Sequence, residues 1–160
     1  MKTLVLSVVI AMASVINTVS GNATNRFVYN SEVSEEGVKS ETVFKIEDGK
    51  YLHNHLKYNY IYDKEGRISR KEVLKWNENT QTFEKHHSLN FFYTDDVTIE
   101  YASWNKKNNA YSDSKEKAVY QTGNNTLRYI GYEWNKKESN WKLKTEHDAA
   151  YWNEPLLANK

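Results

Sequence analysis

Hydrophobic and polar positions alternate along much of the chain, and short groups of turn-forming residues interrupt the alternation. In one such stretch, Val97, Ile99 and Tyr101 fall on one side of an extended strand, with Thr98 and Glu100 on the other. No segment after residue 23 has the 3.6-residue apolar period of an amphipathic helix. The pattern therefore predicts strands near residues 27–30, 41–47, 50–62, 67–76, 83–93, 97–104, 111–121, 127–134 and 141–151.

Turn signals recur at short intervals from about residue 48 onwards. Asp48-Gly49 is typical of a tight hairpin, and Asp63 and Gly66 bound a second turn in which glycine suits a left-handed conformation. Strands joined by short turns form an antiparallel meander. We expect an all-β fold of seven to nine strands, either a curled sheet or an open barrel.

Three Trp-Asn pairs have a second aromatic residue seven positions after the tryptophan. The intervening residues are polar and turn-forming. This recurrence indicates repeated hairpin units. The three tryptophan–aromatic pairs are Trp76 and Phe83, Trp104 and Tyr111, and Trp134 and Trp141.

The physical interpretation of the repeat is a hairpin held by an aromatic clasp. Each strand ends at Trp-Asn, four or five polar residues turn, and the return strand starts at the second aromatic. The two rings then face each other across the strands and fix the register. Asparagine tolerates turn conformations, which explains its place after each tryptophan.

The first 23 residues have the layout of a secretory signal peptide. One cation, Lys2, precedes an apolar run from Leu4 to about Val15, and small polar residues follow up to a cleavage site after Ala23. A membrane anchor is the alternative, but the apolar run is short for a span. We expect an exported protein, periplasmic or secreted, with residues 24–160 as a single domain and no membrane span once the leader is removed.

Composition narrows the class of protein further. The chain has 22 basic and 21 acidic side chains; one of the basic ones, Lys2, belongs to the leader, so the remainder is balanced. Neutral balance argues against nucleic acid as a partner. The absence of cysteine excludes a disulfide framework and a lipid-anchored lipoprotein. Abundant aromatic residues argue against disorder.

The motifs then resemble known families. Tyr62-Asp63-x-x-Gly66-Arg67 resembles the tyrosine-aspartate repeats of large bacterial surface and toxin proteins, although the later units lack Asp-x-x-Gly-Arg. The whole arrangement, over roughly residues 40–151, is similar to small exported proteins of gut Bacteroidetes, which form domain of unknown function family 3836. The resemblance implies a β-hairpin fold and export, and it brings no catalytic residues.

Two groups of residues are candidates for chemistry. Histidines from neighbouring strands could bind zinc, and adjacent acids could act as glycosidase carboxylates. Partly exposed sheet histidines and solvated turn acids explain them better, so we expect no catalytic residue, no metal site and no cofactor. The residues concerned are His53, His55, His86, His87, His147, Asp95, Asp96, Glu35 and Glu36.

The aromatic residues are the remaining candidates for binding. Exposed tryptophan and tyrosine side chains stack on sugar rings, although here the hairpin clasp already explains their spacing. A mildly basic fringe lies within residues 105–145, in the Trp-Asn-Lys-Lys turns. We expect a non-catalytic module that contacts a glycan or a cell-surface protein. The alternatives are a small polysaccharide hydrolase or its accessory, and a structural β protein that pairs with itself. The candidate binding residues are Trp76, Trp104, Trp134, Trp141 and Tyr111.

Overall fold

The structure is a computed structural model that describes residues 26–35, 37–48, 50–123 and 126–150. The leader predicted for residues 1–23 lies outside this part of the chain. The described residues form ten strands: β1 (Arg26–Ser34), β2 (Gly37–Glu47), β3 (Tyr51–Tyr62), β4 (Ile68–Asn77), β5 (Thr82–Tyr93), β6 (Val97–Asn105), β7 (Ala110–Tyr111), β8 (Glu116–Gly123), β9 (Thr126–Asn135) and β10 (Asn140–Ala150).

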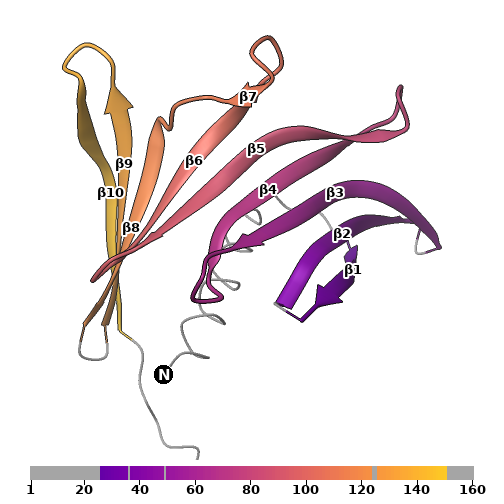
Figure 1. The fold of residues 1–160 in the computed structure, drawn as a ribbon, viewed down its shortest axis with the longest axis horizontal. Coiled ribbons are helices and arrows are strands. Elements are labelled where there is room, and N and C mark those ends of the chain that lie inside the picture. Colours follow the sequence, from indigo (N-terminus) through magenta and orange to yellow (C-terminus); the bar gives the residue numbers. More distant parts are fainter. Residues whose placement is uncertain (1–25, 36, 49, 124–125, 151–160) are drawn as a thin grey trace, which may run out of the picture. The chain divides into compact units, whose positions relative to one another are not determined.

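The predicted antiparallel meander is confirmed. Hydrogen-bonded neighbours follow the order β1-β2-β3-β4-β5-β6-β8-β9-β10, with β7 paired to β6 (Figure 1). Among the described strands, β1 and β10 are the two ends of this order, so the sheet is not closed into a barrel. In the same part of the chain, no helix is long and apolar enough to cross a membrane.

The structure corrects the prediction in two places. The first hairpin is longer than expected, because β1 and β2 pair from Arg26–Ile46 to Ser34–Gly37. The strand predicted over 111–121 is interrupted: between the pairs Trp104–Tyr111 and Tyr101–Glu116, β6 advances three residues while its partner advances five. The polar turn-forming residues at 112–114 occupy this interruption.

The described residues form two compact units, which divide between Ser88 and Leu89 within β5. In the first unit, Val43, Tyr58 and Val73 form a buried cluster, and Leu56 and Tyr60 pack against it. These residues come from three neighbouring strands, β2, β3 and β4. They share one face because Tyr58 lies opposite both Glu41 and Val73 in the ladder, and every second residue returns to that face.

The β3–β4 turn explains the Tyr-Asp-x-x-Gly-Arg motif. Asp63 Oδ1 accepts hydrogen bonds from the backbone N–H groups of Glu65 and Arg67, both at 2.9 Å. The Arg67 side chain donates from Nε to Asp63 Oδ2 at 2.7 Å. Gly66 has a φ of 74°, the left-handed conformation predicted for it. Tyr62 ends the strand and donates its hydroxyl to Val38 O at 2.8 Å.

The second unit has its own buried side chains on β6 and β8. Ile99 lies opposite Ala118, and Tyr120 is two residues further along β8, so the three share one face. Tyr120 continues this layer into β9, where its ring meets the Tyr129 ring at 5.3 Å. Gly131 leaves room on the same face, because a Cβ there would lie 2.8 Å from the Thr145 methyl group.

Candidate functional site

The three Trp-Asn hairpins share one turn. Each loop has four residues between its strands, at 78–81, 106–109 and 136–139. In each, the asparagine after the tryptophan accepts a hydrogen bond, through Oδ1, from the backbone N–H two residues later. The last loop residue adopts a positive φ near 50°. The donors are Asn79, Lys107 and Lys137, at 2.9, 3.0 and 3.0 Å, and the positive-φ residues are Gln81, Asn109 and Ser139.

The predicted aromatic clasps are confirmed. In all three hairpins the tryptophan meets its aromatic partner edge to face, at ring-centroid distances of 4.9 to 5.3 Å. This is the arrangement that aromatic quadrupoles favour, worth about 0.5–1.5 kcal/mol beyond burial. The register agrees, since Trp104 lies opposite Tyr111 and Trp134 lies opposite Trp141.

The clasps lie on the sheet face opposite the buried clusters. In the first unit, Trp76 is three residues from Val73 and therefore faces the other way. In the second unit, the same alternation places Trp104 and Ile99 on opposite faces of β6. All five candidate binding residues are half-buried. Their rings are thus neither core residues nor fully open platforms.

A hollow of about 330 Å³ lies at the third clasp, around the β9–β10 turn. Its lining residues are one tryptophan, one asparagine, one glutamate and three lysines: Trp134, Asn135, Glu133, Lys136, Lys137 and Lys142. The ladder register places the Glu133 and Lys142 side chains on the face opposite the Trp134 ring. Of the five aromatic candidates from the sequence, this hollow includes Trp134.

Other side chains contact the ring of Trp141, the clasp partner of Trp134. Lys117 places its Nζ 4.5 Å from the centroid of the Trp141 ring and 5.2 Å from that of Tyr132. A cation over the ring face, together with the edge contact to Trp134, gives Trp141 a structural role in the hairpin. Trp134 is the aromatic residue among those that line the hollow.

A buried lysine lies in the first unit, and the sequence analysis did not identify it. Lys71 is only 2 % exposed, and its Nζ lies 3.6 Å from the centroid of the Tyr58 ring. Burial lowers the pKa of Lys71 to about 8, although the nearby Glu41 carboxylate opposes this shift. Burial also raises the pKa of Tyr58 to about 12. Because the amine is enclosed, a dissolved ligand has no open path to it.

The histidines of the sequence analysis have ordinary sheet partners. His53 Nε2 lies 3.2 Å from Glu47 Oε2, and His147 Nε2 lies 2.9 Å from Thr145 Oγ1. The Nδ1 atoms of His86 and His87 are 2.7 Å apart, and burial, His86 and Lys71 together lower the pKa of His87 to about 4. Within the described ranges, no group of three or more His, Asp or Glu side chains could hold a metal ion.

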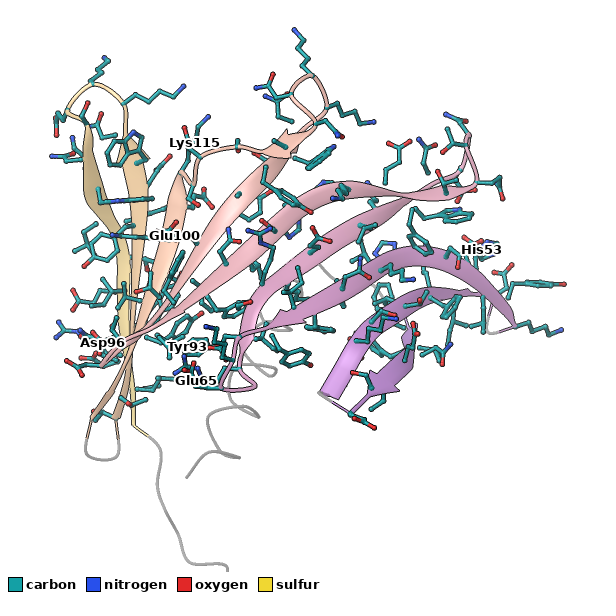
Figure 2. All side chains as sticks on the ribbon, viewed as in Figure 1. His53, Glu65, Tyr93, Asp96, Glu100 and Lys115 are labelled. Atoms are coloured by element: carbon teal, nitrogen blue, oxygen red, sulfur yellow. The ribbon has the colours of Figure 1, made fainter. Side chains whose placement is uncertain are left out.

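The acidic pair at the β5–β6 turn also has a structural partner. Figure 2 shows Asp96 and Tyr93 at the end of this hairpin. Asp96 Oδ2 accepts a hydrogen bond from Gln121 Nε2 at 2.8 Å, while its carbonyl accepts one from Thr94 N at 3.0 Å. Asp96 therefore joins the turn to β8.

Residues 1–122 match the model of DUF3836, described as a family of unknown function. The chain belongs to this family. DUF3836 is the family that the sequence motifs resembled, and the match includes the first two clasps and ends before the third. The search of curated proteins found no match to the chain.

Two solved structures from Bacteroidales species share the fold. A protein with unknown function from Bacteroides fragilis NCTC 9343 is 24% identical with a TM-score of 0.66, over 80% of this chain and 94% of that one. A DUF3836 family protein from Parabacteroides distasonis ATCC 8503 is 19% identical with a TM-score of 0.55, over 59% of this chain and 89% of that one. Both likenesses concern the fold alone.

Proposed function

We propose that this DUF3836 protein is an exported, non-catalytic module that binds a glycan at the β9–β10 turn. The observation that carries the proposal is the hollow of about 330 Å³ at this turn, which Trp134 lines together with polar and cationic residues. Its volume falls at the lower end of ligand pockets, which span about 300–1,000 Å³.

The chemistry of the lining suits a sugar. One face of a pyranose ring carries C–H groups, and these pack against an aromatic ring. The hydroxyl groups around the ring both donate and accept hydrogen bonds. Asn135 supplies an amide and Lys137 an ammonium donor among the residues that line the hollow. The leader expected from the sequence supports the proposal, because export brings a protein to extracellular glycans.

The turn geometry supports a prepared site. Asn135 Oδ1 already accepts the Lys137 N–H at 3.0 Å, which leaves its amide group free to donate. Trp134 is fixed by the edge contact to Trp141 and by its backbone N–H, which donates to Lys115 O at 2.7 Å. A ring held in place loses little freedom when a ligand binds.

Binding is tested with a glycan array, followed by calorimetric titration of the best hit. We expect Trp134→Ala to abolish binding and Trp134→Phe, which keeps an aromatic clasp, to weaken it. Trp76→Phe changes the equivalent position of the first hairpin and should leave binding unchanged. Circular dichroism identifies variants that fail to fold. Folded Trp134→Ala protein that binds as well as the parent would refute the proposal.

A specific observation also favours the self-pairing alternative. The end strand β1 exposes Val28, Tyr29 and Val33, at 40%, 54% and 68%. The other end strand, β10, carries Lys142 and Lys144 and a register irregularity, which are devices that discourage edge pairing. A second copy of the chain could therefore add to β1. Tyr29→Lys should then abolish any growth of particle size with concentration in light scattering, and a size independent of concentration would exclude it.

A further inference from the structure

Two lysine-bearing turns lie at one end of the second unit, and their tryptophans lie on one face of it. β6 and β9 run in the same direction, because β8 pairs antiparallel with both. Lys117 lies opposite Glu100 on β6 and opposite Tyr132 on β9, so these three residues form one row on one face. Trp104 is four residues beyond this row and Trp134 is two beyond it, in the same direction and on the same face.

The register also gives the separation of the two clasps. The offset of two residues corresponds to about 7 Å along the strands, and the step from β6 across β8 to β9 corresponds to about 10 Å. A single sugar in the β9–β10 hollow therefore does not reach the β6–β7 turn. A chain of several sugars, crossing β8, does.

Four lysines at this end have no acidic partner among the described residues. Among the described residues, no carboxylate lies within ion-pair distance of Lys107, Lys115, Lys136 or Lys137. By contrast, Lys142 pairs with Glu138 at 3.0 Å and Lys144 pairs with Glu116 at 3.5 Å. Lys107 belongs to the β6–β7 turn, and Lys136 and Lys137 belong to the β9–β10 turn. Figure 2 shows Lys115 at the same end of this unit, on the segment that leads into β8.

We propose that the ligand of the second unit is a linear anionic polysaccharide, with a carboxylate or sulfate on repeating sugars. It lies across the strands from the Trp134 hollow to the β6–β7 turn. This inference rests on the proposed function and specifies its ligand. The ammonium groups of Lys107, Lys136 and Lys137 neutralise successive anionic groups, while Trp134 and Trp104 provide the apolar surfaces between them.

A length series of uronic acid oligosaccharides, from the monosaccharide to the hexasaccharide, tests the inference by calorimetry at low and at high salt. We expect affinity to rise with length and to fall as salt rises. Lys107→Gln should weaken the hexasaccharide about two- to fivefold, the range of one exposed charge pair, and leave the monosaccharide unchanged. Lys137→Gln should weaken both. Lys64→Gln, in the β3–β4 turn of the first unit, is the matched control and should weaken neither.

The outcomes separate this inference from the proposed function. Equal binding of neutral and uronic oligosaccharides overturns the anionic ligand while the glycan site stands. Affinity that does not change with length overturns the path to the β6–β7 turn. Equal binding of a single-stranded oligonucleotide shows a general polyanion surface and overturns the polysaccharide. If neither neutral nor acidic saccharides bind, the proposed function itself fails.

Discussion

Replacement of the buried Lys71 tests the electrostatic account of the first unit. The amine is buried against the Tyr58 and Tyr60 rings of β3, and its pKa falls from 10.5 to about 8. This difference corresponds to about 3 kcal/mol of destabilisation of the folded state at neutral pH, where the amine is protonated. Lys71→Met, which keeps the chain length and removes the buried charge, should therefore raise the free energy of unfolding at pH 7 by up to about 3 kcal/mol.

The pH dependence gives the sharper readout. Between the folded pKa of about 8 and the unfolded value of 10.5, the unfolded chain binds more protons at this position than the folded one. Stability therefore rises with pH in that window. From about pH 8 to about pH 9.5 the gain from Lys71 is roughly 2 kcal/mol, which follows from about 1.4 kcal/mol per pH unit for one proton. The window stops there because tyrosines of the unfolded chain ionise near pH 10, while the pKa of Tyr58 in the fold is about 12.

Urea unfolding at several pH values measures this effect directly. The parent protein should gain stability relative to Lys71→Met as the pH rises from about 8 to about 9.5. Lys75→Met is the matched control, since Lys75 lies on the same face of β4 but is exposed, and it should follow the parent. His87, whose pKa of about 4 is lowered partly by Lys71, does not titrate in this range. Identical pH profiles for the parent and Lys71→Met would refute the reasoning.

Other predictions concern the turns, each measured by urea unfolding. Gly66→Ala should cost about 1 kcal/mol from its left-handed backbone alone, because nothing lies within 4 Å of the added Cβ. Gly37→Ala should cost more, since its φ is 130° and the Cβ would lie 3.0 Å from the Tyr62 hydroxyl; an equal cost would contradict this contact. Ser139→Gly should gain a few tenths of a kcal/mol, as glycine accepts the positive φ; a loss would contradict the strained backbone. Asp63→Asn should destabilise at neutral pH. Desolvation raises the pKa of Asp63, but hydrogen bonds from Arg67 and Glu65 lower it overall, so the parent's advantage should vanish as pH falls below about 3.8; an advantage that persists would exclude the charge as its source.

The sequence predicted the hairpins because their determinants are local. Trp76 and Phe83 are seven residues apart, and only a four-residue loop brings them into contact, so the spacing alone indicates the register. Asp63 and Gly66 likewise carry a turn within a few residues. The short turns predict the meander. They do not predict whether the sheet stays open, because closure depends on whether the first and last strands pair with each other.

Other features depend on distant partners. β4 alternates Lys71, Val73 and Lys75 on one face, and nothing in that pattern tells which lysine is buried. That outcome depends on Tyr58 and Glu41, contributed by other strands. The hollow at Trp134 was missed for a similar reason: Lys136 and Lys137 follow the Trp-Asn motif, but Lys142 joins them from the return strand. The turn residues at 112–114 were a usable signal for the break between β7 and β8.

The central claim is that a saccharide binds at Trp134, and the indole N–H signals test it most directly. The chain has five tryptophans, so a protein labelled with ¹⁵N at the indole gives one resolvable signal for each, assigned by substitution. During titration with a uronic acid hexasaccharide, we predict that the Trp134 signal shifts most, that Trp104 follows, and that Trp76 stays in place. A titration in which the Trp134 signal does not move, or in which Trp76 moves as far, would contradict the account.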